Sequence, residues 1–175
     1  MERSDERTSQ QAVVLVGHGG IPKDFPRDQL TRLKALEAKR RTAGTDPTPE
    51  EMELDTRLRR WPRTSETDPY QEGLEALAAQ LKPFLNGVRV AIAYNEFCAP
   101  TVEEAVVQLI TTGARPITVV PSMLTPGGSH SEIDIPESLQ RLRTRYPDID
   151  LRYAWPFDLS AVAAMLAAQL RRFQS

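Results

Sequence analysis

The chain has two histidines, and each follows a short apolar run that ends in glycines. His18 lies in the stretch VVLVGHGG (13–20), and His130 ends the stretch ITVVPSMLTPGGSH (117–130). Neutral imidazole binds divalent transition metals and also transfers protons near neutral pH. Glycines beside it allow a ligand to approach the backbone closely. The two similar settings therefore predict one shared site for metal binding or proton transfer.

The elements that position these histidines alternate between strand and helix patterns. Apolar, β-branched runs predict four strands, within 13–16, 87–97, 115–124 and 148–157. Apolar residues at helical spacing predict four helices, within 68–85, 99–114, 134–147 and 158–173. This alternation is typical of an α/β domain, with a parallel, roughly four-stranded sheet flanked by helices and joined by right-handed crossovers.

Local signals predict where two of these helices begin and where one ends. Asp68 has the side chain of an N-cap, and Pro69 follows it at the first helical position. Thr101 and Glu104 have the spacing of a capping box. Gly113 stands where a glycine commonly ends a helix.

Residues 20–67 do not follow the alternation of strands and helices. The segment is rich in charge, and its part 48–61 begins with a proline in what would be a first helical turn. A structureless connection of this length would be unusual. We therefore expect a helical insertion after the first strand, within a single domain that spans 12–175 and follows a flexible tail at 1–11.

The composition of the chain indicates which binding partners and which cellular location to expect. The formal net charge of -2 gives no global sign of a nucleic-acid or anionic-membrane partner. No apolar run is long enough for a signal sequence or a membrane span. The one cysteine, Cys98, excludes an intrachain disulfide and is expected to be a small buried residue. We therefore expect a cytoplasmic protein with no nucleic-acid or membrane partner.

In an open parallel sheet, ligands bind just beyond the carboxyl ends of the strands. His18 follows the first predicted strand, Glu96 ends the second, and His130 follows the third after a short loop. These three side chains are thus predicted to converge on one edge. Alternatives stay open for each: a histidine in a glycine turn can simply be hydrogen-bonded there, and Glu96 can cap the next helix. A hydrolase with a glycine-rich oxyanion hole is less consistent, because the chain has no G-x-S-x-G motif.

Taken together, these motifs resemble the class II tetrapyrrole chelatases of the CbiX/SirB type, the small sirohydrochlorin cobalt, iron and nickel chelatases. The shared pattern is a strand ending in G-H-G, the stretch EFCAPT (96–101) that opens a helix, the strand GARPITVVP (113–121), and HSEIDIP (130–136). The family has a serine where this chain has Gly20, and the long segment 20–67 is extra relative to the short members.

The resemblance implies a lyase that inserts Co²⁺, Fe²⁺ or Ni²⁺ into sirohydrochlorin or a related tetrapyrrole, in siroheme or cobalamin biosynthesis. It implies that His18 and His130 bind the incoming metal, which is a substrate, and that Glu96 helps to remove the pyrrole protons. Asp134 is expected to cap the following helix and to orient His130. No organic cofactor is expected. A metal or tetrapyrrole carrier that keeps the fold without catalysis is the alternative.

The tetrapyrrole is expected to approach the backbone at five small residues, Gly19, Gly20, Gly127, Gly128 and Ser129. Because sirohydrochlorin carries many carboxylates, cationic side chains should rim the cleft. Lys23 and Arg27 are candidates, although both also fit a solvated loop. Single-domain members of the family are homodimers, which implies a homodimer here. The insertion could cover the cleft, alter substrate choice or build the dimer.

Overall fold

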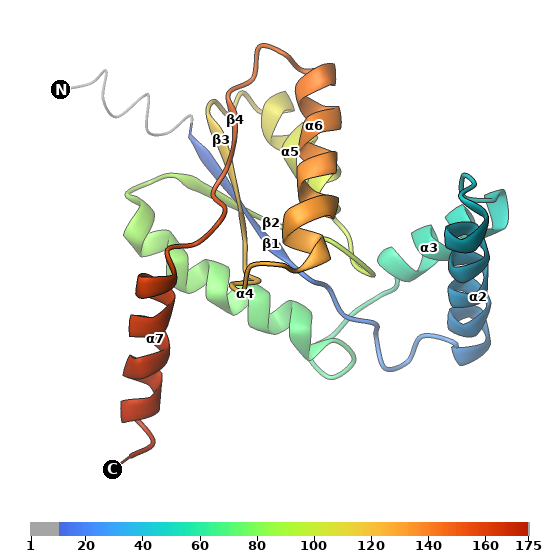
Figure 1. Ribbon diagram of the computed structural model, residues 1–175, viewed down its shortest axis with the longest axis horizontal. Helices are drawn as coiled ribbons and strands as arrows, with labels where there is room; N and C mark the ends of the chain where they lie inside the picture. The colour runs from blue at the N-terminus through green and yellow to red at the C-terminus, as the bar shows by residue number, and fades with distance from the viewer. Residues whose placement is uncertain (1–10, 175) are drawn as a thin grey trace.

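Four parallel strands form the sheet of this protein, in the order β2-β1-β3-β4 (Figure 1). A computed structural model describes residues 11–174. The strands are β1 (Ala12–Gly17), β2 (Arg89–Tyr94), β3 (Ile117–Pro121) and β4 (Leu151–Tyr153). The expected parallel four-stranded α/β architecture is therefore confirmed. β1 extends one residue beyond each end of its predicted run, and the other three strands are shorter than theirs. The predicted tail at 1–11 falls almost wholly on residues 1–10, which lie outside the described part of the chain.

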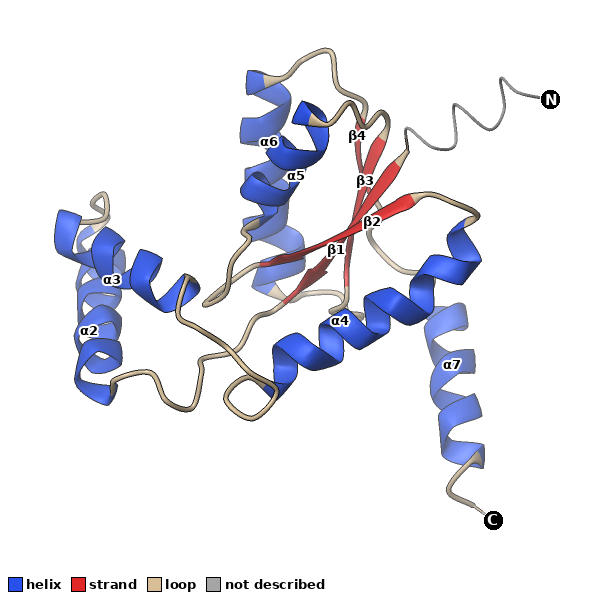
Figure 2. Cartoon of the chain, turned by 180° about the vertical axis from the view of Figure 1, so that it is seen from behind, coloured by secondary structure: helices blue, strands red, loops and turns tan. Residues whose placement is uncertain are grey.

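The described residues form six α-helices around this sheet (Figure 2). They are α2 (Arg27–Ala43), α3 (Pro49–Arg59), α4 (Pro69–Leu81), α5 (Val102–Thr111), α6 (Ile135–Arg145) and α7 (Leu159–Arg171). A 3-10 turn, η1 (Lys82–Leu85), extends α4, and a π-helical turn, η2 (His130–Asp134), precedes α6. Within 11–174, no helix combines the length and the apolarity needed to cross a bilayer.

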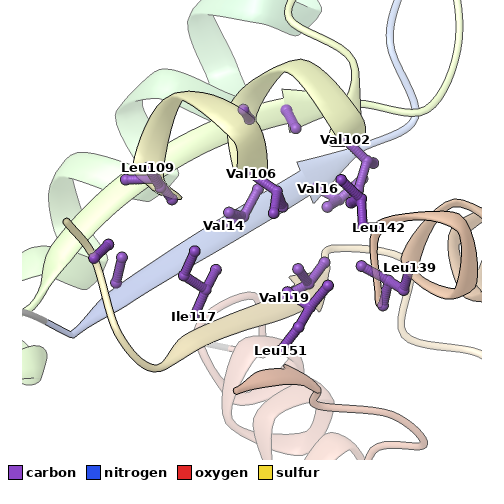
Figure 3. Packing of buried hydrophobic residues seen from close by; sticks show 14 of the residues in the cluster. Val14, Val16, Val102, Val106, Leu109, Ile117, Val119, Leu139, Leu142 and Leu151 are labelled. Atoms are coloured by element: carbon purple, nitrogen blue, oxygen red, sulfur yellow. The ribbon is translucent and has the colours of Figure 1, made fainter. Parts of the chain in front are cut away.

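The central strand β1 is buried on both faces, which explains its uninterrupted apolar run. Val14 and Val16 face α5 and α6 in the larger core cluster (Figure 3). Leu15 points to the opposite face and packs with Leu74 and Ala78 of α4. The apolar residues of β1 therefore hold one helical layer on each side of the sheet.

The register of the sheet brings the ends of three strands to one level. Gly17 of β1 is aligned with Tyr94 of β2, and Val16 is aligned with Pro121 of β3. The hydrogen bonding between β1 and β2 continues one residue beyond β2, because the Asn95 amide donates to the Gly17 carbonyl at 2.9 Å. The residues that follow the strands, including His18, therefore start from the same edge.

The predicted beginnings of α4 and α5 are confirmed. The Asp68 carboxylate accepts a hydrogen bond from the Gln71 amide at 3.1 Å, and α4 begins with Pro69. Thr101 and Glu104 form both bonds of a capping box at the start of α5. These bonds satisfy backbone amides that a first helical turn otherwise leaves without partners.

The segment after β1 is helical, as predicted, and its two helices form a hairpin with a small core of its own. Phe25, Leu33 and Leu58 are buried together, and Phe97 packs against them from the main domain. Arg32 of α2 and Glu50 of α3 join the two helices through a bidentate ion pair at 2.7 Å. Figures 1 and 2 show this hairpin on the side of the sheet where β1 ends.

No residue of helix α7 is fully buried in the described chain, and only Val162 and Ala167 are partly buried. Met165 is exposed on this helix, and four further exposed apolar residues fall at helical spacing and form one stripe, made of Leu159, Leu166, Leu170 and the following Phe173. Contiguous exposed apolar surface of this kind is typical of interaction sites.

Candidate metal site

Three polar side chains from three different loops meet at the carboxyl edge of the sheet. His18 follows β1, Glu96 follows β2, and His130 begins the turn after β3. One possible ligand atom from each lies within 4.8 Å of the other two. The two imidazoles are edge to face, with ring centroids 4.7 Å apart, and His18 Nε2 lies 3.9 Å from Glu96 Oε2. The structure thus brings together the three residues that the strand ends predict.

The strand order explains why the site forms here. From β1 the chain moves to one side of the sheet to form β2, and then crosses back to the other side of β1 to form β3. The connections after β1 and β3 therefore leave the sheet in different directions and open a crevice between them. His18 and His130 occupy the two sides of this switch point.

His18 is held in an orientation that leaves one ring nitrogen free. Its Nδ1 lies 2.9 Å from the Gly19 carbonyl, which can only accept, so Nδ1 carries the proton. Its backbone amide donates to the Tyr70 hydroxyl at 2.7 Å. The lone pair of Nε2 therefore faces Glu96 and is available to a metal ion.

His130 is oriented by a carboxylate. Its Nδ1 donates to Asp134 Oδ2 at 2.6 Å, and this leaves Nε2 as the metal-binding atom. The side-chain amide of Asn95 lies 2.7 Å from Nδ1 and donates to the same carboxylate at 3.3 Å. A carboxylate behind the imidazole fixes the orientation of the ring, as in many metal sites. The expected orienting contact between Asp134 and His130 is therefore present.

The expected helix cap at Asp134 is wrong. Asp134 has helical backbone angles (φ -64°, ψ -48°), and its side chain makes no capping hydrogen bond. The helical turn begins earlier, at His130, because the Ile135 amide donates to the His130 carbonyl in a π-type turn. The carboxylate is thereby free to accept from His130, and π-turns of this kind are frequent at functional sites.

Gly19 allows the loops that carry His18 and Glu96 to touch. It has φ +97°, and a Cβ at this position would lie 1.8 Å from the Glu96 carbonyl oxygen. The Glu96 amide also donates to the His18 carbonyl at 2.8 Å. Close packing between two protein loops thus explains this glycine, and its contact with a tetrapyrrole stays a prediction.

The other residues that are predicted to contact a tetrapyrrole are not equally accessible. A Cβ at Gly20 would lie 3.0 Å from Asp68 Oδ1, so a serine in this place would meet that carboxylate. Gly127 and Gly128 have open space around them, and Ser129 is exposed. The second glycine pair is therefore the more accessible of the two to a large ligand.

Cys98 is buried, as predicted, and takes no part in the metal site. Burial raises the pKa of its thiol to about 11. The thiol is therefore neutral at pH 8, and only a thiolate reacts readily with disulfide reagents.

We expect native Cys98 to react with 5,5′-dithiobis(2-nitrobenzoic acid) at pH 8 more than about tenfold more slowly than in urea-unfolded protein. Release of thionitrobenzoate, followed by absorbance, measures both rates. Equal rates would show that the thiol is accessible and ionised in the folded state.

A cleft of about 500 Å³ opens beside the three residues, between the α2–α3 hairpin and the helices α5 and α6. Glu96, Asn95 and Asp134 line both the cleft and the surroundings of the histidines. The lining carboxylates are Glu37, Glu51, Asp55, Glu96, Glu103, Asp134 and Glu137, and the arginines are Arg40, Arg41, Arg59 and Arg141. The lining of the cleft thus has more carboxylates than arginines.

The arginines of this cleft are not the cations expected beside the macrocycle, and contact of Lys23 and Arg27 with a tetrapyrrole stays a prediction. Lys23 and Arg27 are not among the residues that line this cleft. Its arginines come from both hairpin helices and from α6. The packing of the hairpin decides which cations line the cleft, and no local sequence pattern shows this packing.

Two further residues of the site, Asn95 and Tyr70, were not identified from the sequence. Asn95 directly precedes Glu96 at a strand end, so the argument from strand ends could have found it. Tyr70 lies 52 residues from His18, and its hydrogen bond to the His18 amide has no sequence signal.

Fold and site together define a class of α/β protein in which two histidines at the switch point of a parallel sheet offer free nitrogens to a metal ion. The CbiX family model matches residues 63–173, and the chain belongs to this family. The matched range includes Glu96 and His130 but not His18, whose place in the site is shown by geometry.

Two curated relatives match parts of the chain. The sirohydrochlorin ferrochelatase of Priestia megaterium is 35% identical over 66 residues, which are 38% of this chain and 24% of that protein. The sirohydrochlorin cobaltochelatase of Priestia megaterium is 28% identical over 89 residues, 51% of this chain and 29% of the relative. The chain thus matches less than a third of the length of either relative.

The crystal structure of a CbiX protein from Marinobacter aquaeolei VT8 has a similar fold. The TM-score is 0.50 at 20% identity, with 93% of this chain and 98% of that chain covered. This similarity supports the α/β architecture described above.

Proposed function

We propose that this protein is a chelatase, a lyase that inserts Co²⁺, Fe²⁺ or Ni²⁺ into sirohydrochlorin or a related tetrapyrrole. One observation carries the proposal: two histidines with free Nε2 atoms and one carboxylate lie within 4.8 Å of one another at an accessible sheet edge. Membership of the CbiX family and the names of the two relatives agree with this activity.

The donor set suits an ion that must be delivered and not retained. Two imidazoles and a carboxylate replace part of the hydration shell and leave open coordination positions for pyrrole nitrogens. Neutral nitrogen donors also release such ions more readily than thiolates, which form the tightest sites. The side chain of His18 is 42% exposed, so a large second substrate can reach the ion.

Insertion also requires a group that accepts the two pyrrole protons. Among the described residues, none forms a hydrogen bond to the Glu96 carboxylate, although His18 Nε2 lies 3.9 Å away. The carboxylate oxygen that does not bind the metal is thus free to accept a proton from the macrocycle, as a general base must be. Glu96 is therefore the base in the proposed reaction.

The charges suggest separate approaches for the two substrates. The cleft has seven lining carboxylates against four arginines, and three of those arginines already pair with Glu51, Asp55 and Glu103. An excess of negative charge concentrates cations and repels a polycarboxylate. We assign the cleft to the incoming metal and the exposed side at Gly127–Ser129 to the macrocycle.

We further propose a cytoplasmic homodimer. The apolar stripe of α7 supports association with a second copy, since it has no partner in the described chain. The single cysteine is consistent with a reducing compartment.

The test is an anaerobic assay with sirohydrochlorin and Co²⁺, Fe²⁺ or Ni²⁺ in turn, followed by the absorbance change on insertion. We expect at least about a hundredfold acceleration over the uncatalysed rate with one or more of the metals. Folded protein that shifts the spectrum of the tetrapyrrole without accelerating insertion of any metal would instead identify a carrier.

A further inference from the structure

Arg63 connects four segments around the metal site through one buried guanidinium. Its side chain is 5% exposed. Nη1 donates to the Gly20 carbonyl at 2.8 Å and to the Asp68 carboxylate. Nη2 donates to the Leu58 carbonyl at 3.2 Å and to the Phe97 carbonyl. These acceptors belong to the loop after β1, the start of α4, the end of α3 and the loop after β2.

Two of these acceptors lie next to the proposed metal ligands. Gly20 is two residues beyond His18, and Phe97 directly follows Glu96. Phe97 has φ +59°, a backbone conformation that residues other than glycine rarely adopt. Such a conformation persists only when surrounding contacts hold it, and the Arg63 guanidinium supplies one of them.

Asp68 links Arg63 to the backbone of His18 through helix α4. Its carboxylate binds Arg63 and also caps α4 by accepting from the Gln71 amide at 3.1 Å. The second residue of that helix is Tyr70, whose hydroxyl accepts from the His18 amide at 2.7 Å. The buried ion pair therefore fixes the helix end that holds His18.

Only arginine can make all these contacts at once. A guanidinium is planar and presents five N–H donors in a fixed fork, whereas an ammonium group is a single compact point. We propose that Arg63 is a positioning residue that sets the separation of His18 and Glu96 for metal binding. This inference rests on the proposed function, because it assigns both residues to the metal.

The first experiment measures the dissociation constant of Co²⁺ for the wild type and for Arg63→Lys, in the full chain without tetrapyrrole. We expect binding about 10- to 100-fold weaker in the variant, as is usual when a supporting residue of a metal site is changed. Arg143→Lys is the matched control, since Arg143 also donates to a backbone carbonyl, that of Leu151 at 3.0 Å, away from the site. It should bind Co²⁺ like the wild type.

A double-mutant cycle separates positioning from general stability. If Arg63 acts by placing Glu96 beside His18, then Arg63→Lys should weaken binding less than about threefold once Glu96→Gln is present. An equal loss in both backgrounds, or no loss in the wild-type background, would overturn the proposal. Asp68→Asn, which keeps a capping oxygen but removes the ion pair, replaces Arg63→Lys if the latter does not fold.

A readout without metal keeps this inference separate from the proposed function. Hydrogen exchange at the Asn95 and Glu96 amides, which bond to the Gly17 and His18 carbonyls, should accelerate at least about tenfold in Arg63→Lys. Unchanged exchange would refute the positioning role. Failure of the wild type to bind Co²⁺, with faster exchange in the variant, would instead refute only the metal assignment.

Discussion

Replacing His130 by alanine is expected to weaken Co²⁺ binding at least about 100-fold and to reduce metal insertion to the uncatalysed rate. The substitution removes one of three donors, and it is the imidazole that the Asp134 carboxylate supports at 2.6 Å. Cobalt titration and the anaerobic insertion assay measure the two effects.

Folding should survive this change, because His130 belongs to a turn at the surface and lies outside the buried clusters. Gln140→Ala, an exposed change on α6, is the control and should leave binding and insertion unchanged. Full insertion activity in folded His130→Ala would remove this residue from the site.

The second large effect concerns Gly19, where alanine should lower the free energy of unfolding by about 3 kcal/mol or more. The new Cβ would lie 1.8 Å from the Glu96 carbonyl oxygen, and φ +97° is unfavourable for any residue with a side chain. The loops after β1 and β2 would have to separate. Urea unfolding followed by circular dichroism measures the loss.

Gly87→Ala is the matched control for this effect. Gly87 has φ +86°, but no atom lies within 4 Å of the place that an added Cβ would take, so its substitution isolates the backbone penalty, about 1 kcal/mol. The difference between the two variants reports the contact between the loops. Equal losses at both positions would show that this contact contributes nothing.

The parts of the fold that sequence predicts are those set by neighbours in the chain or by general topology. Thr101 and Glu104 identify a helix start because both bonds of the capping box lie within four residues. His18 and His130 are predicted to meet because the carboxyl ends of parallel strands share an edge. Neither prediction requires knowledge of how side chains pack.

The parts that sequence does not predict depend on contacts between distant segments. Asp134 has the residue type of a helix cap, but its hydrogen bond to His130 and the π-type turn decide its role. Arg63 lies in a charged segment without periodicity, and only the folded chain shows that it is buried. The same holds for the arginines of the cleft, three of which pair with carboxylates that also line it.

The Lys23 amide donates to the Thr67 carbonyl at 2.9 Å, so the two ends of the segment that contains the helical hairpin lie side by side. A chain that passed directly from one to the other would join β1 to α4 by a short loop, as in an ordinary βαβ unit. The hairpin buries Leu33 and Leu58 mainly in its own core, outside the two clusters of the sheet. It therefore joins the rest of the domain at one place, between β1 and α4, and substitutions inside its core leave the register of β1, β2 and β3 unchanged.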